Sequence, residues 1–285
     1  PPIGPDERLV RDFFLYFFKQ DVDFNQYLPL VKDTYLKQAF AEAKLVNGVG
    51  DAERWYSMLS TSQVKALQER IDLDFAPANK VFYKASDPVS LKVSIKNVKK
   101  LIVRVFEINT FNFYSRNLQP VNTAINLDGL AATREQTYNY DERPLRRVER
   151  NFNFPELKKR GVYVVEFIGN GRSSRALISK GNLRVLEDTG SAGHEFRVLD
   201  EDNKACPKAT LWLSGNEYKV GKDGLIVVPF SNRPGRQTMV LRNGGFSALA
   251  SFVHQSETYS LDAGIYVDRE ALVTGALAKL VVRPV

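Results

Sequence analysis

A rhythm of short apolar segments and polar turns between His194 and Phe230 places the strongest constraint on the fold of this chain. The apolar segments are residues 196–199, 209–213 and 225–230, and the turns are residues 200–204 and 222–224. Segments of about five residues, with a turn signal about every 8–12 residues, are typical of the strands of a small antiparallel sandwich. Because the stretch holds no obvious reactive group, it predicts a class of fold and not an activity.

The composition is that of an ordinary globular chain. It has 285 residues, of which 44% are hydrophobic and 26% charged, and this length suggests about two domains. Residues 13–18 form the longest apolar run of the first third, far below the roughly 20 residues that cross a bilayer. We therefore expect no transmembrane segment. The start has two prolines, no Met and no signal-peptide pattern, and the end reads as a strand, so we expect a fragment of a longer protein.

Charge is unevenly distributed along the chain, whose net charge is +7. Residues 1–79 hold 9 basic and 12 acidic residues, residues 80–188 hold 20 and 11, and residues 189–285 hold 11 and 10. The basic character therefore belongs to the middle third, which favours treating the thirds as separate units. Cys206 is the single cysteine, so no internal disulfide can form and the fold depends on its core.

The first third, residues 1–79, is expected to be helical. Apolar residues follow the i, i+4 spacing of one helix face at Val31, Tyr35, Ala39, Phe40 and Ala43. Gly48 is expected to end this helix, Asp51 to cap the next one, and Ser60 with Gln63 to form a capping box. The aromatic-rich residues 6–18 predict a buried helix. The alternative, a helix on a membrane surface, would need a Lys/Arg-rich polar face that this segment lacks.

From residue 71 onward, strand patterns replace helical ones. Apolar Leu91, Val93 and Ile95 alternate with polar residues, as in a strand with one wet face, and residues 101–108 predict a more buried strand. Residues 109–154 have weak patterning, so they either hide short strands or form a functional excursion. Residues 188–193 are small and polar and predict a linker. We thus expect a helical region at 1–79, one β-sandwich at 80–188 and a second at 189–285.

Four short motifs resemble macroglobulin-type domains of the α2-macroglobulin superfamily. They are the strand at 161–166 after a basic run, the strand at 101–106, the segment 265–270 with Gly275 and 278–282, and Asp223-Gly224 with Pro229. The last motif is also similar to carboxypeptidase-regulatory-like sandwiches. The resemblance covers about residues 80–285 and leaves the helical part unmatched. It implies Ig-like or macroglobulin-like sandwiches in tandem, the last residues starting a further domain.

Departures from that family limit what the resemblance implies about activity. The Cys-Gly-Glu-Gln thioester is absent, Cys206 lies in Ala-Cys-Pro instead, and no proline precedes Gly275. Protease trapping through a thioester is therefore not expected of this chain. The resemblance favours an extracellular, periplasmic or cell-surface location, and a cytoplasmic one stays open.

Candidate catalytic and metal groups are sparse. His194, Cys206 and His254 lack the spacing of a metal site, and Cys206 beside Pro207 suits a buried structural thiol better than a nucleophile. The acidic residues 200–202 are expected to form a solvated turn, since no calcium-loop spacing accompanies them. We therefore expect no catalytic, metal or cofactor-binding residues.

A basic cluster in the middle third is the one feature that suggests binding. It consists of Arg143, Arg146, Arg147, Arg150, Lys158, Lys159 and Arg160. Aromatic residues are interleaved with it, and guanidinium groups suit phosphate, sulfate and carboxylate ligands. The alternative is a solvated loop whose arginines pair with neighbouring acidic residues. No DNA- or RNA-binding motif accompanies the cluster, so nucleic acid is not favoured.

These observations predict a mainly β chain, with tandem antiparallel sandwiches after a small helical region. The leading functional hypothesis is a non-enzymatic structural or protein-interaction module within a larger α2-macroglobulin-like protein. Its partners would be other domains of the same longer chain or a separate protein. Two alternatives stay open, which are a polyanion- or carbohydrate-binding module that uses the basic cluster, and a hydrolase.

Overall fold

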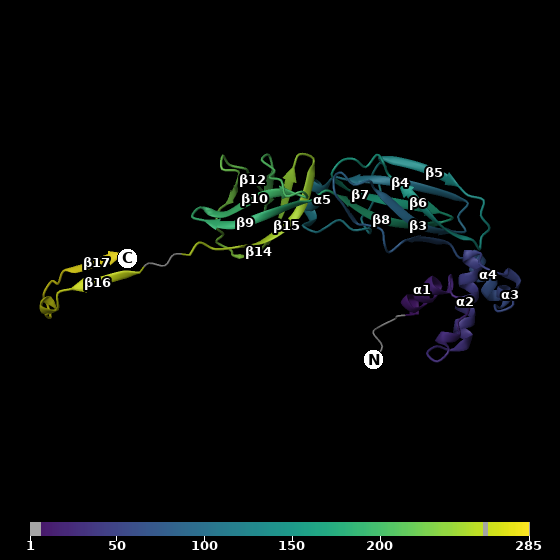
Figure 1. The fold of residues 1–285 in the computed structure, drawn as a ribbon. Helices are drawn as coiled ribbons and strands as arrows, with labels where there is room; N and C mark the ends of the chain where they lie inside the picture. Colours follow the sequence, from purple (N-terminus) through teal and green to yellow (C-terminus); the bar gives the residue numbers. More distant parts are fainter. Residues whose placement is uncertain (1–6, 259–261, 285) are drawn as a thin grey trace.

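The structure is a computed structural model that describes residues 7–258 and 262–284. A helical region, two β-sandwiches and a terminal β-hairpin follow one another along the molecule (Figure 1). The mainly β fold with Ig-like domains and a small helical region is confirmed. No described helix has both the length and the apolar character that a membrane-spanning helix needs.

The helical region forms where its capping residues predict. It contains α1 (Glu7–Phe18), η1 (Asn25–Tyr27), α2 (Asp33–Asn47), α3 (Ala52–Tyr56) and α4 (Thr61–Glu69). Gly48 ends α2 in the left-handed conformation, with φ 64°, and the Asp51 side chain accepts from Glu53 N at the start of α3. Ser60 and Gln63 form the expected capping box of α4. The core of the region is aromatic, and Phe18 packs edge-on against Phe40 with 5.2 Å between ring centroids.

The first sandwich pairs a five-stranded sheet with a three-stranded sheet. The larger sheet has the order β2-β8-β7-β4-β5, with bounds β2 (Phe82–Tyr83), β4 (Lys100–Ile108), β5 (Arg134–Asn139), β7 (Gly161–Gly169) and β8 (Arg172–Lys180). The smaller sheet has the order β1-β3-β6, with bounds β1 (Asp72–Phe75), β3 (Ser90–Lys96) and β6 (Arg147–Asn153). Val93, Leu101 and Phe167 are almost fully buried between the sheets. Since β1 pairs with β3, the strands of this sandwich begin at Asp72, earlier than residue 80.

The weakly patterned residues 109–154 hide short elements. They contain β5, β6 and an additional helix, α5 (Thr110–Asn117), which the absence of helical periodicity did not predict. Asn109 caps α5, because its side chain accepts a hydrogen bond from Asn112 N at 3.0 Å. The alternative of short strands is therefore confirmed for part of this region.

The second sandwich also has two sheets. One has the order β13-β10-β9, with bounds β9 (Leu183–Gly190), β10 (Gly193–Asp200) and β13 (Ile226–Val228). The other has the order β12-β11-β14-β15, with bounds β11 (Thr210–Leu213), β12 (Asn216–Lys219), β14 (Gly235–Asn243) and β15 (Phe246–His254). Cys206 is a buried free thiol in this core, and burial raises its pKa, as suits a structural residue.

The predicted linker at residues 188–193 is wrong. β9 and β10 pair antiparallel along their whole length, and Gly190 lies opposite Gly193 across a two-residue turn. Small polar residues suit a tight hairpin turn as well as a linker, so the sequence alone could not distinguish the two. The division of the chain at residues 79 and 188 stays a prediction. Because β9 pairs with β10 of the second sandwich, the boundary between the two sandwiches would lie at about residue 182.

The terminal hairpin consists of β16 (Ala263–Val267), η2 (Arg269–Ala271) and β17 (Leu280–Pro284). Its apolar side chains are exposed, as at Tyr266, Leu272 and Leu277. A lone two-stranded hairpin is marginally stable in water, and it usually needs a further sheet or helix against its apolar side. The expectation that these residues start a further domain stays a prediction.

Candidate interaction surface and the junctions that position it

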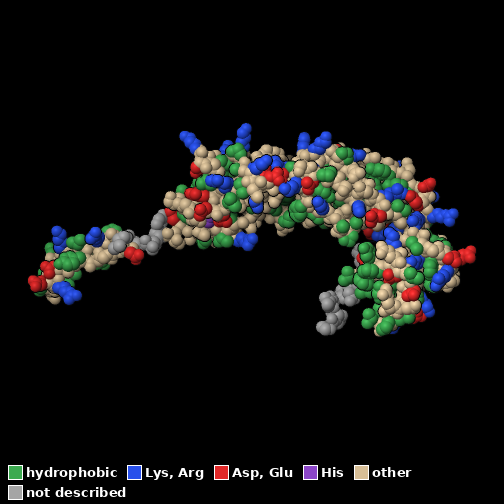
Figure 2. Space-filling view, viewed as in Figure 1, with side chains coloured by type: hydrophobic (Ala, Val, Ile, Leu, Met, Phe, Trp, Pro, Cys, Tyr) green, Lys and Arg blue, Asp and Glu red, His purple; other side chains and the backbone are tan. Residues whose placement is uncertain are grey.

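The outer face of α1 is apolar and exposed. Leu9, Phe13, Tyr16 and Phe17 follow the i, i+4, i+7, i+8 spacing of one helix face and are 73%, 50%, 70% and 39% exposed. Phe14 and Phe18, on the opposite face, are buried against the rest of the helical region. The prediction of a buried helix thus holds for one face only. We call these four residues the α1 apolar face, and Figure 2 shows hydrophobic side chains gathered on the helical region.

Ring contacts hold this face together. The ring centroids of Phe13 and Phe17 are 4.6 Å apart, and those of Tyr16 and Phe17 are 5.1 Å apart in an edge-on arrangement. Single exposed apolar residues are common on protein surfaces, whereas several that adjoin on one helix face are typical of a protein–protein or membrane contact. Aromatic residues that already contact one another lose less side-chain freedom when a partner binds.

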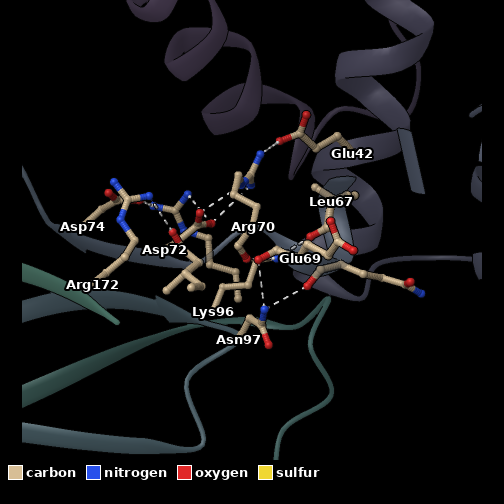
Figure 3. Close-up of polar contacts among 12 residues, drawn as sticks. Glu42, Leu67, Glu69, Arg70, Asp72, Asp74, Lys96, Asn97 and Arg172 are labelled. Carbon is tan, nitrogen blue, oxygen red and sulfur yellow. Dashed lines mark hydrogen bonds and ion pairs between the residues drawn. The ribbon is translucent and has the colours of Figure 1, made fainter. Parts of the chain in front are cut away.

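A junction built on α4 joins the helical region to the first sandwich. Lys96, at the end of β3, donates from Nζ to the carbonyl oxygens of Leu67 and Arg70, at 2.5 and 2.6 Å. Asn97 donates from Nδ2 to the carbonyl oxygens of Gln68 and Glu69 (Figure 3). The last carbonyls of a helix have no partner within the helix, so two residues of the sandwich satisfy the end of α4. A cation there is also favoured by the helix dipole.

A chain of ion pairs continues this junction from α1 to β6. Glu42 Oε1 lies 2.5 Å from nitrogens of both Arg11 and Arg70, and Arg70 Nε lies 2.9 Å from Asp72 Oδ1. Arg147 then lies 3.6 Å from Asp72 and 3.1 Å from an oxygen of Asp74. A cavity of about 320 Å³ adjoins these groups. Arg70, Arg147, Asp72 and Asp74 line this cavity and pair with one another, so we assign it to the junction.

A second junction joins the two sandwiches. Apolar residues of both, among them Val164 of the first and Val240 of the second, form one buried cluster with Tyr114 of α5. Around it, Arg160 pairs with Asp200 and Glu201 at 3.3 and 3.0 Å. Because apolar packing and ion pairs act together, the sandwiches are expected to behave as one stiff unit.

The basic cluster is divided by the fold. Arg147 lies in the first junction, Arg160 lies in the second, and Arg150 pairs with Glu142 while its guanidinium lies over the Tyr140 ring at 3.9 Å. The remaining four, Arg143, Arg146, Lys158 and Lys159, are exposed. Three of the seven residues are thus held in ion pairs within the chain. A partner-binding role of the cluster stays a prediction.

The sequence did not predict two features, the exposed α1 apolar face and the capping of α4 by Lys96 and Asn97. The spacing of Leu9, Phe13, Tyr16 and Phe17 was readable, but the aromatic residues on the opposite face hid which side would be buried. No local pattern marks Lys96 and Asn97, because the helix end that they cap is distant in sequence. Within residues 7–258 and 262–284, no three His, Cys, Asp or Glu side chains are grouped as metal ligands.

Comparison with known proteins relates the parts of the chain to one protein. Residues 1–71 match the family described as the actin-binding protein F N-terminal domain, and residues 101–181 match the AbpF first immunoglobulin-like domain. Actin-binding protein F of Dictyostelium discoideum is 37% identical over an aligned length of 286 residues, and the alignment covers 98% of this chain and 12% of that protein. The chain therefore spans a small part of the length of this relative.

Solved structures resemble the chain more distantly. Domains MG0-NIE-MG1 of the α2-macroglobulin from Escherichia coli are 14% identical with a TM-score of 0.42, and cover 64% of each chain. Domains NIE-MG1 of the same protein are 15% identical with a TM-score of 0.39, and cover 64% of this chain and 96% of that one. Likenesses at this identity and TM-score concern the fold alone and do not show membership of the α2-macroglobulin family.

Both the helical region and the first sandwich match families named for one protein, and the identity to that protein runs through the second sandwich as well. Residues 1–71 resemble its N-terminal domain and residues 101–181 its first Ig-like domain, and the chain is similar over nearly its whole length to actin-binding protein F.

Proposed function

We propose that this chain is a non-enzymatic protein-interaction module that binds actin through the α1 apolar face. The main support for this proposal is that the α1 apolar face, formed by Leu9, Phe13, Tyr16 and Phe17, is exposed. The similarity to a protein named for actin binding supplies the partner. The first junction supports the proposal further, because Arg11 pairs α1 with Glu42 of α2 and Lys96 joins the helical region to the first sandwich.

The test is co-sedimentation with actin filaments at low and high salt. Leu9→Ser and Tyr16→Ser are combined, since both side chains are mostly exposed and their replacement leaves the core intact. Loss of two central apolar contacts should weaken binding about tenfold or more. Because the contact is apolar, salt should change the affinity little.

The matched control replaces two apolar residues of the second sandwich that are similarly exposed, Leu186→Ser and Val253→Ser. This variant should sediment with filaments as the natural chain does. Failure of the natural chain to sediment would rule out actin as the partner. Equal binding by the Leu9/Tyr16 variant would rule out the α1 apolar face as the contact.

A further inference from the structure

The open side of the first sandwich carries a groove between two edge strands. β5 is the last strand of the five-stranded sheet and β6 the last strand of the three-stranded sheet. Both line a groove of about 620 Å³, within the range of roughly 300–1,000 Å³ that is common for ligand sites. Inward-facing Arg134, Gln136 and Tyr138 of β5 are only half-buried, so this edge of the sandwich stays partly open to solvent.

The free edge of β5 faces outward from the sheet. Tyr140 N donates to Lys99 O, and the N–H groups of a strand point alternately to its two sides. The N–H groups of Thr137 and Asn139 therefore point away from β4. Among the described residues neither has a hydrogen-bond partner. Such an edge accepts an additional strand through main-chain hydrogen bonds.

The aromatic rings in the groove are already covered by neighbours. Arg150 lies over the face of Tyr140, 3.9 Å from its centroid, and Phe152 packs edge-on against Tyr138 at 5.2 Å. Sugar rings and nucleobases need an open aromatic face on which to stack. These contacts therefore favour a ligand that binds mainly through its backbone.

Charge further restricts the ligand. The charged side chains that β5 and β6 direct between the sheets, Arg134 and Arg150, are both basic and partly exposed. Their partners, Glu156 and Glu142, lie outside these two strands. Glu149 also lines the groove, and Lys92 lies 3.8 Å from its carboxylate. A guanidinium has five N–H donors, so each arginine can hold a second carboxylate beside the first.

We propose that the groove binds an extended peptide segment of a partner protein, which adds to β5 as a further strand. The peptide places an apolar side chain against Tyr138 and an acidic side chain beside Arg150. The six residues of β5 offer an edge of about 20 Å, enough for a segment of similar length. This surface is separate from the α1 apolar face and needs no actin.

The probe is a phage library of random linear peptides of about twelve residues, selected on the whole chain and followed by synthesis of the enriched sequences. Thr137→Pro removes the outward N–H from an edge position where proline is tolerated. It should raise the Kd of the selected peptides about tenfold or more, whereas Thr137→Val, which keeps the N–H, should leave the Kd unchanged. Arg150→Met should weaken acidic peptides most.

Amide exchange gives a second readout that needs no variant. In the natural chain, bound peptide should slow exchange of the Thr137 and Asn139 N–H groups. The proposal is overturned if no peptide is enriched, if Thr137→Pro binds as well as Thr137→Val, or if these two amides stay unprotected. If Asn151→Pro abolishes binding and Thr137→Pro does not, the peptide adds to β6 and not to β5, which also overturns the proposal. Binding of a glycan that Thr137→Pro retains, without peptide binding, would identify a sugar site instead.

Discussion

The ammonium nitrogen of Lys96 lies 2.6 Å from the carbonyl oxygen of Arg70, across the junction between the sandwich and the helical region. Lys96 is one of the most deeply buried charged residues among those described, and both of its hydrogen-bond acceptors are main-chain atoms at the end of α4. A helix end is normally capped by residues close to it in sequence. The last turn of α4 is instead capped by Lys96 of β3, which is distant in sequence.

Replacing Lys96 by Met should therefore destabilise the helical region more than the sandwich. One buried and one partly buried carbonyl would lose their donor, and each unsatisfied group costs about 1–3 kcal/mol. We expect a loss of about 2–4 kcal/mol in urea unfolding followed by tryptophan fluorescence in a Trp212→Phe background, in which Trp55 of the helical core is the reporter. Lys92→Met is the control on the same strand. Lys92 is exposed and 3.8 Å from Glu149, so its loss should cost about 0–1 kcal/mol.

The contribution of Lys96 to stability should rise with pH. Burial lowers the pKa of Lys96 from 10.5 to about 8, with the charge of Asp72 acting in the opposite direction. The unfolded chain holds this proton more tightly than the folded chain does, so unfolding takes up a proton between about pH 8 and 10.5. The unfolding free energy of the natural chain, relative to Lys96→Met, should increase across this window. A constant difference would show that the ammonium keeps its ordinary pKa, and a difference that falls would show that folding raises this pKa; either result would contradict the prediction.

The second junction should loosen when Glu201 becomes Gln. Its side chain is 8% exposed and accepts from Arg160, from Ala85 N and from Asn182 N, so it ties three segments together. Loss of the buried charge leaves Arg160 with Asp200 alone, and we expect about 1–3 kcal/mol of destabilisation in thermal unfolding. Small-angle scattering should show a wider range of angles between the sandwiches. Asp202→Asn, whose pair with Lys84 is exposed, should change neither measurement.

The hairpin turn between β9 and β10 requires glycine at position 193. Gly193 has φ 134°, and a Cβ there would lie 2.2 Å from the carbonyl oxygen of Val228. Gly193→Ala should therefore disrupt the pairing of β10 with β13 and lower the melting temperature of the second sandwich by several degrees, as for a loss of about 2 kcal/mol or more. Gly129→Ala, with φ 80° and open space around it, should cost only about 1 kcal/mol. Equal effects of the two substitutions would contradict the importance of the close approach.

Local signals explain the elements that could be predicted. Gly48, Asp51 and Ser60 act on backbone groups within a few residues, so their caps could be read directly from the chain. The prediction of a linker at residues 188–193 was wrong because it depended on distant rather than local signals. Whether small polar residues link two domains or turn a hairpin depends on the strands on both sides, and one of those strands carried no clear alternation.

The sequence by itself determined the mainly β class, the helical start and most caps, because periodicity and capping are local properties of the chain. Only the tertiary structure decided which face of α1 stays exposed and which arginines of the basic cluster are already paired. It also decided that Lys96 and Asn97 cap a helix of another region, and that β5 and β6 remain edge strands. These outcomes depend on contacts between residues far apart in sequence, about which local spacing carries no information.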